Sequence, residues 1–591
     1  MDQKLTVLQA IQLAMDHHAA RRYAEAEALY RQVLAQSPDH PAALQMLGRL
    51  AHEVGKTDAA IQILTRAVQV DPRSAGAFNF RGNAYAACGK FHQAAADFQQ
   101  AISINPQFAE AYNNLGNVMR EMSHLDGAAR AYEKALSLKP NYAMTHSNLA
   151  ITYKDQGRVA EAIASFDRAL ALNPDDAITD SNRLYSLQFL PDITPQRLFD
   201  EHRQWAQRRV RNRLAPVGHS NDRSPDRVLR IGYLSSDLRY HSVAFFLLPL
   251  LRSHDRRRHH ITCYPTTAYN DNFTAQFRAC CDEWRPLLGV PDAAAAQVIR
   301  NDRIDILVDL TGHTSNGRLP LLMAKPAPVQ VSYLGYPNTT GLETMDWRLT
   351  DALADPPGSE AFYTEKLYRL PRTAWCFAPL SGQPPVEPIQ RPGITFGSFN
   401  DMAKMNQPLL RLWSRVLGAV PGSRLMIKNR ATNSPVVCDQ FRARAAEFGI
   451  PADRLDLIPP VAAPEQHLRA YGQVDIALDT FPYHGATTTC ESLWMGVPVV
   501  TLAGSAHVSR VGVSLLSSVG LADLIAGDES AYVSIAAALA ADAGRRRDLR
   551  MSLRDRLQGS ALMNGGSLAR EVEAAYQKMW RDYVNCAPSV V

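Results

Sequence analysis

The segment VDIALDTFPYHGATTTCESLWMGVPVVTLAG, residues 474–504, has the clearest folding pattern in the chain. Its apolar start breaks at Asp479–Gly485, and a stretch compatible with a helix follows over Thr487–Trp494. A Gly-Val-Pro turn then leads into a second apolar run, Val499–Leu502. This order predicts a strand, a loop, a helix and a strand, which is the repeating unit of a parallel sheet.

The start of the predicted helix is suited to bind an anion. Gly485 and Ala486 lead into three hydroxyl side chains, Thr487–Thr489. At such a strand end, free backbone N–H groups and the positive end of the helix dipole meet. We therefore expect a diphosphate here, with Glu491 one turn along the helix as an acceptor for ribose hydroxyls. The alternative is an ordinary capped helix of a parallel sheet.

Short apolar strands alternate with helical stretches from Val228 onward, in two series. This alternation predicts two doubly wound, Rossmann-like α/β domains. A linker rich in Pro and Gly, 381–393, separates the first domain, 228–380, from the second, 394–591, which we expect to end in closing helices. Ligands bind at the carboxyl ends of parallel strands, so we expect a ligand in the cleft between the two domains.

The first 190 residues repeat with a period of 34 residues. Prolines recur at this spacing from Pro38 to Pro174, and alanines recur from Ala26 to Ala162. A large apolar residue stands four positions after each of these alanines. The pattern predicts an α-superhelix of tetratricopeptide repeats over 1–190, in which each proline ends the second helix of a pair. The stretch 191–227 is expected to be a helical connector.

Asparagines recur at the same period on the expected inner wall of this superhelix. Their amide groups could hydrogen-bond the main chain of an extended peptide without reading its side chains. The alternative for each of them is a solvated surface position or a hydrogen bond between helices. The candidates for peptide binding are Asn79, Asn113, Asn114, Asn148 and Asn182.

Composition limits the classes of function. The formal net charge of +5 is small for 591 residues, and the basic runs lack interleaved aromatic residues, so we expect no nucleic acid partner. No apolar run reaches the roughly 18 residues that span a membrane, and no signal peptide is evident, which leads us to expect a cytoplasmic protein without a membrane partner. The eight cysteines are scattered, so neither disulfides nor a metal site is expected.

Polar residues gather in the loops that follow the strands of the first domain. The loop after the first strand contains Asp237 and His241. A histidine on such a loop can titrate near neutrality, although it can also be an ordinary hydrogen-bonded residue. No nucleophile elbow, Walker lysine or intact G-x-G-x-x-G supports a hydrolase, an NTPase or a dehydrogenase. The other residues expected to line the cleft are His313, Tyr336, Pro337 and Thr339.

Four ordered motifs that follow the repeats resemble the protein O-linked N-acetylglucosamine transferases, in particular the shorter bacterial members. The motifs are GYLSSDLRYHSV (232–243), LGYPNTTG (334–341), FGSFNDMAK (396–404) and LDTFPYHGATTTCESLWMGVPVV (478–500). The resemblance implies a two-domain glycosyltransferase of the B architecture, inverting, metal-independent and without a cofactor. It also implies transfer of N-acetylglucosamine from UDP-GlcNAc to Ser or Thr hydroxyls of proteins that lie in the cleft and along the repeat groove.

The resemblance also implies roles for single residues. His241 matches the active-site histidine, and Lys404 matches the lysine that neutralises the leaving diphosphate. Without a metal, a positioned ammonium together with a helix N-terminus can take that role. The other matches lie in the nucleotide pocket: Thr487 and Thr488 at the phosphates, His467 near the base, and the main chain of Ala462 at the base.

Four positions of the nucleotide pocket depart from the animal members of the resembled group. Asp401 stands for a glutamine, Pro464 for a lysine, Ala486 for a histidine, and Glu491 for the aspartate that contacts the ribose. Each charge-assisted hydrogen bond is worth about 1.5–3 kcal/mol, so these changes are expected to weaken nucleotide binding by about tenfold or more.

Two other functions compete with this interpretation. One is a different donor or acceptor on the same architecture, because the plant fucosyltransferases and the bacterial asparagine glucosyltransferases resemble this group. The other is a non-catalytic adaptor, in which the repeats bind peptides and the second half senses a nucleotide sugar. The retained His241 and Lys404 favour an enzyme, whereas Asp401, Pro464 and Ala486 favour the adaptor.

Overall fold

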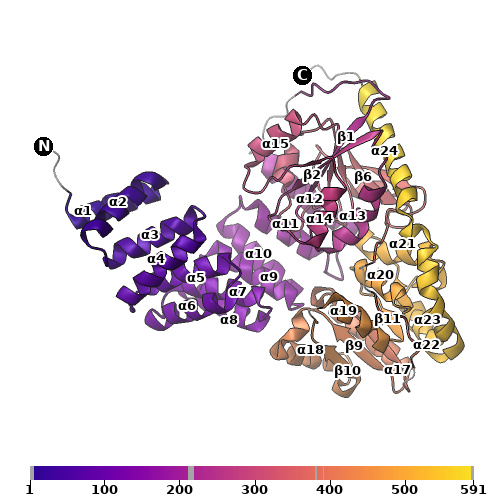
Figure 1. The fold of residues 1–591 in the computed structure, drawn as a ribbon. Coiled ribbons are helices and arrows are strands. Elements are labelled where there is room, and N and C mark those ends of the chain that lie inside the picture. Colours follow the sequence, from indigo (N-terminus) through magenta and orange to yellow (C-terminus); the bar gives the residue numbers. More distant parts are fainter. Residues whose placement is uncertain (1–4, 211–217, 380–382, 390–391, 462, 587–591) are drawn as a thin grey trace. The chain divides into compact units, whose positions relative to one another are not determined.

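The computed structural model describes residues 5–210, 218–379, 383–389, 392–461 and 463–586 (Figure 1). The chain divides into two compact units. The first contains Met1–Gln156 and Asp167–Pro174, and the second contains Gly157–Phe166 and Asp175–Val591. Within the described ranges, no helix is long and apolar enough to cross a membrane.

The repeat region is a series of antiparallel helix pairs, so the predicted tetratricopeptide array is confirmed. A Cβ added to Gly82 would lie 2.7 Å from the Phe98 ring, which explains why a glycine faces the large residue of its own pair. Phe98 also joins Leu115 of the next pair in a buried cluster. The helices are α1 Val7–Ala19, α2 Tyr23–Gln36, α3 Pro41–Glu53, α4 Thr57–Val70, α5 Ala75–Ala87, α6 Phe91–Ile104, α7 Ala109–Glu121, α8 Leu125–Leu138, α9 Ala143–Asp155 and α10 Val159–Leu172.

The periodic asparagines of the array bond to one another, which corrects the prediction for two of them. Asn79 and Asn113 are only 4% and 0% exposed, so their amides are not available to a peptide. Asn114 donates to Asn79 Oδ1 over 3.1 Å, and Asn148 donates to Asn113 Oδ1 over 3.2 Å. Hydrogen bonds between helices therefore account for Asn79 and Asn113. Asn114 and Asn148 remain half-buried, as does Asn182, which lies in the second unit.

The first α/β domain is built on a seven-stranded sheet of order β3-β2-β1-β4-β5-β6-β7, in which every pairing is parallel. The order reverses between β1 and β4, as in doubly wound folds. The strands are β1 Leu229–Ser235, β2 His259–Pro265, β3 Glu283–Trp284, β4 Ile306–Asp309, β5 Val329–Ser332, β6 Trp347–Asp351 and β7 Lys366–Leu370. The helices between them are α13 Ser242–Ser253, α14 Asn272–Ala279, α15 Asp292–Asn301 and α16 Leu319–Met323.

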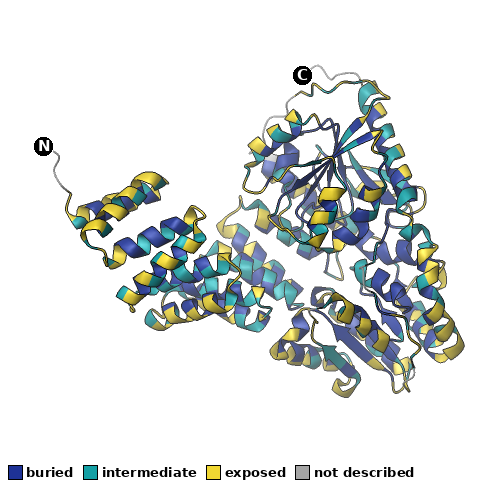
Figure 2. Ribbon diagram, in the orientation of Figure 1, coloured by how far each residue is buried: buried dark blue, intermediate teal, exposed yellow. Residues whose placement is uncertain are grey.

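Two helices that follow the array, α11 (Ala177–Leu187) and α12 (Pro195–Val210), pack into the core of this first domain. Leu184 and Trp205 are fully buried there, in one cluster with Leu234 and Leu307. Apolar side chains of α11, and of α12 in the predicted connector, are therefore part of the domain core. Figure 2 shows that most residues of the strands around this core are buried.

The second α/β domain has a six-stranded parallel sheet of order β10-β9-β8-β11-β12-β13, which reverses between β8 and β11. The predicted fold class, a repeat array followed by two doubly wound domains, is confirmed. The strands are β8 Thr395–Ser398, β9 Arg424–Lys428, β10 Leu455–Ile458, β11 Ile476–Leu478, β12 Val499–Leu502 and β13 Ile525–Ala526. The helices are α17 Gln407–Ala419, α18 Pro435–Glu447, α19 Pro464–Ala470, α20 Thr487–Trp494, α21 Val511–Ser518, α22 Glu529–Ala541, α23 Ala543–Gln558 and α24 Gly565–Asn585.

The chain passes twice from one α/β domain to the other. It crosses first between β7 and β8, and it returns before α24, which packs against α13 and β7 of the first domain (Figure 1). The two crossings are joined by a backbone hydrogen bond of 2.6 Å from Phe377 N–H to the carbonyl of Leu562. The last helix of the chain is therefore part of the first domain's packing.

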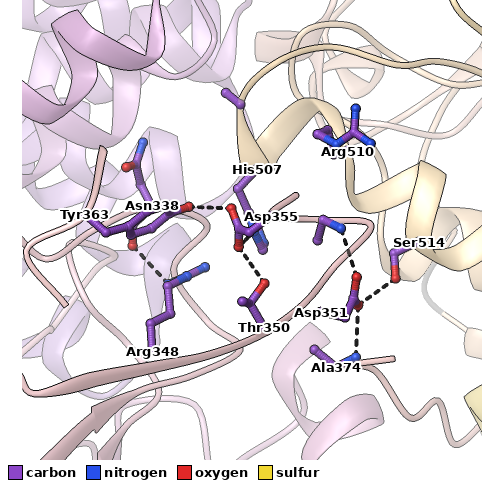
Figure 3. Close-up of polar contacts among 12 residues, drawn as sticks. Asn338, Arg348, Thr350, Asp351, Asp355, Tyr363, Ala374, His507, Arg510 and Ser514 are labelled. Carbon is purple, nitrogen blue, oxygen red and sulfur yellow. Dashed lines mark hydrogen bonds and ion pairs between the residues drawn. The ribbon is translucent and has the colours of Figure 1, made fainter. Parts of the chain in front are cut away.

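A buried polar contact also joins the two domains (Figure 3). Asp355, which follows β6, forms a 2.7 Å hydrogen bond with Nδ1 of His507, which follows β12. Nearby, Ser514 of α21 donates to Asp351 over 2.7 Å, and Arg510 donates to the carbonyl of Leu353 over 2.8 Å. Burial alone would raise the pKa of Asp355, but His507, Arg348 and the hydroxyl of Thr350 hold it well below its usual range.

Asp355→Asn is expected to lower the free energy of unfolding at pH 7 by about 1.5–3 kcal/mol, because a buried hydrogen bond to a charge is lost. The pKa of Asp355 is depressed in the folded state, so its stabilisation is present above the unfolded value near 4 and is lost as the pH falls. The difference between the variant and the parent should thus shrink below about pH 4 in urea unfolding. Asp226→Asn, in an exposed ion pair with Arg581, is the control, and an equal effect of both variants would contradict the assignment.

Candidate active site

The site is organised by the reversal of strand order in the second sheet. β8 and β11 are neighbours, with Phe396 opposite Ile476, and their carboxyl ends open at the same edge. The loop after β8 forms a short 3₁₀ turn, Met402–Lys404, and the loop after β11 leads into α20 at Thr487. The predicted lysine and the predicted threonines therefore lie together, although about 80 residues separate them in the sequence.

A single amide oxygen joins these two elements. Asn400 Oδ1 accepts a hydrogen bond from Thr488 Oγ1 over 3.1 Å and another from Lys404 Nζ over 3.3 Å. Lys404 Nζ also donates to the carbonyl of His484 over 2.8 Å. Asn400 is a site residue that none of the sequence motifs predicts. Its signal was its position, directly after a buried strand and four residues before the matched lysine.

Gly485 provides space at this point and not a hydrogen-bond donor, which corrects one part of the prediction. Its N–H already donates to Asp479 Oδ1 over 2.8 Å. A Cβ at Gly485 would lie 2.3 Å from Thr488 Oγ1 and 3.0 Å from Asn400 Oδ1. No side chain caps the helix start at Ala486, so the N–H groups of its first turn face the site uncapped. A helix start of this kind favours an anion.

Lys404 is half-buried, and the surrounding protein shields its ammonium from water. This shielding lowers the pKa of Lys404 to about 8, against the opposing effect of the Asp401 and Asp479 carboxylates. The side chain of Asp401 is exposed. Its carbonyl accepts the backbone hydrogen bond of the 3₁₀ turn. Lys404 is therefore mainly charged at pH 7 and loses its charge as the pH rises through about 8.

A second polar group lies farther along α20, where a nucleoside would follow the phosphates. His467 Nε2 lies 3.0 Å from Glu491 Oε2, and Lys428 Nζ lies 2.6 Å from His467 Nδ1. An ammonium can only donate, so Nδ1 accepts, and Nε2 carries the proton that it donates to Glu491. Tyr471 also donates to Glu491 over 3.2 Å. Phe399 provides an aromatic surface beside this group, 4.4 Å from the ring of Tyr471 between centroids.

Lys428 was missed in the sequence analysis. It is the last residue of β9 and only 4% exposed, so an ammonium is present at the nucleoside end although Pro464 stands where animal members have a lysine. Burial lowers the pKa of Lys428, and the Glu491 carboxylate opposes that shift. The feature of the sequence that could have indicated Lys428 is its place directly after the apolar run Leu425–Ile427. Pro464 begins α19, and Ala462 lies outside the described residues.

His241 begins α13 after β1, at the point where the order of the first sheet reverses. Its Nδ1 accepts a hydrogen bond of 3.3 Å from the N–H of Val243 and lies 3.7 Å from Asp237 Oδ2. Burial lowers the pKa of His241, and the Asp237 carboxylate opposes part of this shift. The net lowering favours the neutral ring. Partial burial raises the pKa of the adjacent Tyr240, and the negative charge of Glu491 in the second domain raises it further.

Four residues expected to line the cleft are instead buried. His313 is 0% exposed, with one ring nitrogen 3.0 Å from Ser181 Oγ and the other 2.9 Å from the carbonyl of Thr340. Tyr336 lies 2.6 Å from His202, and Thr339 donates to Glu365 over 2.6 Å. Pro337 is buried in the same loop. These side chains hold the loops after β4 and β5 in place, and the prediction that they line the cleft is wrong.

Two segments of the chain, residues 208–377 and 389–572, match the model of glycosyl transferase family 41, and together they cover more than half of the sequence. The chain belongs to glycosyl transferase family 41. Tetratricopeptide models match residues 17–81, 82–123, 109–142 and 143–176. The resemblance stated from the motifs is therefore confirmed at the level of the family.

Curated relatives match about two thirds of this family 41 chain. The probable UDP-N-acetylglucosamine–peptide N-acetylglucosaminyltransferase SPINDLY of Arabidopsis thaliana is 42% identical over 412 residues, which cover 68% of this chain and 45% of that protein. The SPINDLY protein of Solanum lycopersicum is 41% identical, over 68% of this chain and 44% of its own length. The chain therefore spans less than half the length of these relatives.

A solved structure covers more of the family 41 chain. A lysine-to-methionine mutant of the Thermobaculum terrenum O-GlcNAc transferase is 35% identical, with a TM-score of 0.82. The match covers 86% of this chain and 98% of that structure. The arrangement of an array followed by two α/β domains is therefore shared with a solved O-GlcNAc transferase.

Gly485→Ala is expected to weaken the binding of UDP or GDP by about tenfold or more, because the added methyl group displaces Thr488 and Asn400 from the phosphate position. Calorimetric titration of each nucleotide measures the change. Gly527→Ala is the matched control, since a Cβ at Gly527 meets nothing within 4 Å. Equal affinities of parent and Gly485→Ala protein would remove this helix start from the nucleotide site.

Proposed function

We propose that this family 41 enzyme transfers N-acetylglucosamine from UDP-GlcNAc to Ser or Thr hydroxyls of proteins, with inversion at the anomeric carbon and without a metal. The observation that carries the proposal is the bonding of both Lys404 and Thr488 to Asn400 Oδ1 at the start of α20. This places a cation, a hydroxyl and uncapped N–H groups around one point. A diphosphate is the part of a nucleotide sugar that such a point recognises.

The transfer forms a bond between the acceptor oxygen and the anomeric carbon and breaks the bond from that carbon to the diphosphate. The bonding electrons leave with the diphosphate, so negative charge grows beside Lys404 and the first turn of α20. Groups already aimed at that charge lower the barrier, because they need no rearrangement during the reaction. No step in this scheme is assigned to a metal.

His241 stands at the carboxyl end of β1 in the first domain, and its hydrogen bonding favours an orienting role over that of a base. Because Nδ1 accepts from Val243 N–H, the neutral ring carries its proton on Nε2. Nε2 can then donate to the acceptor or to the donor sugar, but it cannot remove a proton in this tautomer. The acceptor proton would then pass to a phosphate oxygen of the donor or to water.

Proteins bound along the repeat array are the proposed acceptors. Asn114 and Asn148 are half-buried, and their amide N–H groups already donate to neighbouring asparagines. Their amide oxygens are acceptors for the main-chain N–H groups of an extended segment, a contact that does not depend on its side chains. Asn182 is half-buried in α11 and is the candidate contact nearest in sequence to the α/β domains.

A different donor, such as a GDP-sugar in O-fucosyl transfer or another sugar in N-glucosyl transfer, is the second candidate. It is favoured by the Lys428–His467–Glu491 group, which differs from the animal pattern. The Glu491 carboxylate accepts equally well from ribose hydroxyls and from the N–H edge of guanine. An adaptor without transfer predicts nucleotide binding and no product.

A donor screen tests these alternatives. The parent protein is incubated with UDP-GlcNAc, GDP-fucose and UDP-glucose in the presence of an acceptor protein, and the product mass identifies the sugar. Transfer from UDP-GlcNAc alone supports the leading proposal, transfer from GDP-fucose or to asparagine supports the second, and no transfer from any donor supports the adaptor.

With the active donor, Lys404→Met should lose transfer by about a hundredfold or more, because no cation then meets the leaving diphosphate. For the parent, kcat/KM should fall as the pH rises through about 8, since Lys404 loses its charge there. Lys404→Arg keeps a cation at every pH, so any activity that it retains should lack this alkaline decline. Parental turnover in Lys404→Met would show that the lysine has no catalytic role.

His241→Ala should lose most transfer while UDP affinity changes by only a few-fold, because the side chain meets the reacting end of the donor. His241→Gln distinguishes the two roles, since its amide N–H can replace the donor on Nε2 but cannot accept a proton as a base. Rescue by glutamine is expected for the orienting role. A glutamine variant as inactive as alanine would instead favour a base.

A further inference from the structure

The ammonium of Lys404 lies over an aromatic ring. Its Nζ is 4.4 Å from the ring centroid of Tyr483, which stands in the loop between β11 and α20. The negative face of an aromatic ring attracts a cation, so Tyr483 favours one position of a side chain that otherwise has four rotatable bonds. Tyr483 is half-buried, and its own carbonyl accepts from Thr480 over 2.6 Å, which fixes the backbone beneath the ring.

The ring of Tyr483 is in turn packed against aromatic residues from the helices that follow the array. Phe189, just after α11, stacks on Tyr483 with 4.8 Å between centroids and 9° between planes. Tyr185 of α11 meets Phe189 edge-on at 5.2 Å and Tyr483 edge-on at 6.2 Å. Phe189 is only 3% exposed, so the stack is a buried contact. Residues from α11 thus reach Lys404 through one intervening ring.

A second contact holds the backbone of the Lys404 turn. Gly157, in the turn before α10, lies so close that a Cβ there would be 2.8 Å from the carbonyl oxygen of Met402. The Gly157 carbonyl accepts from Arg444 over 3.2 Å. Val159 of α10 packs with Ala403 and Phe189 in one buried cluster. The turn that bears Lys404 is therefore held at its backbone by α10 and at its side chain by α11, through Tyr483.

We propose that Tyr483 and Phe189 are positioning residues for Lys404, so that α11 at the end of the repeats sets where the leaving-group cation stands. This inference rests on the proposed role of Lys404 in transfer. Neither ring needs to touch the donor. Loss of the stack would leave the ammonium present but spread over several rotamers, and only part of the molecules would then have the cation at the diphosphate.

The groups that surround the ammonium make the test specific. Its carboxylate neighbours are Asp401 and Asp479, its hydrogen-bond acceptors are Asn400 and the His484 carbonyl, and its aromatic neighbour is Tyr483. Tyr483→Leu keeps apolar atoms over the lysine but removes the attraction for its charged form. The alkaline limb of kcat/KM should therefore move to lower pH in this variant, a change that a purely structural role of the ring would not produce.

The experiment measures kcat, KM and the pH profile of Tyr483→Leu, Tyr483→Phe and Phe189→Leu with the donor that the parent uses. We expect kcat to fall by about three- to thirtyfold in the two leucine variants, because a cation–π contact of ordinary strength is lost or misplaced. The Kd for the free nucleoside diphosphate should change less than kcat. Tyr483→Phe retains the ring and should keep the parental rate and pH profile.

Phe98→Leu is the matched control, because it makes the same substitution at a buried ring of the array. An equal loss of kcat in Phe98→Leu would assign the effect to stability and overturn the proposal. Parental kcat and pH limb in Tyr483→Leu would overturn it as well, and this half-buried position keeps the test valid if Phe189→Leu does not fold. Lys404→Met distinguishes a failure of the proposed function from a failure of the positioning role alone. If it is fully active, the proposed function fails, and if it is inactive while both leucine variants are unchanged, only the positioning role fails.

Discussion

The adjacency of β8 and β11 is the constraint on which the donor site depends. The chain leaves these two parallel strands toward opposite sides of the sheet, so the loops after them diverge and leave a crevice at their carboxyl ends. Lys404 arrives from one loop and α20 from the other. Neither element forms the proposed diphosphate site alone, because the site combines the ammonium of Lys404 with the backbone N–H groups at the start of α20.

Asn400 is suited to its position between them because its amide is neutral. An acceptor is needed to hold both the ammonium and the Thr488 hydroxyl, and a carboxylate at the same place would neutralise the cation and repel a phosphate. The amide oxygen orients both donors and leaves the positive potential of the site intact. The nearest carboxylate side chain in sequence, Asp401, is exposed and is not among the hydrogen-bond partners of Lys404 Nζ.

Periodicity and strand-end loops were enough to predict the architecture, because both follow from local patterns. The 34-residue repeat and the strand, loop, helix pattern around Thr487 correspond to elements at those places. Contacts between distant segments could not be predicted in this way. Asn400 and Lys428 gain their roles from strands that become neighbours only in the sheet, and the same is true of the stack of Phe189 on Tyr483.

Burial was the property that the sequence analysis judged least well. His313, Tyr336 and Thr339 stand in polar loops after strands, which is the usual place of ligand contacts, yet each is at most 1% exposed. Their partners, Ser181, His202 and Glu365, come from α11, from α12 and from the segment before β7. The helices that follow the array bury these loops, and no local sequence pattern predicts this burial.

The two crossings between the domains restrict how the two sheets can move relative to each other. Phe377 and Leu562 are hydrogen-bonded, so the two connections run side by side and are held to each other where they pass between the domains. The contact between Asp355 and His507 lies beside the first crossing, because the ring of His507 is 6.5 Å from that of Trp375, two residues before Phe377. The crossings, this contact and the stack of Phe189 on Tyr483 all join the two domains. Separation of His241 from α20 would therefore require more than one buried contact to break.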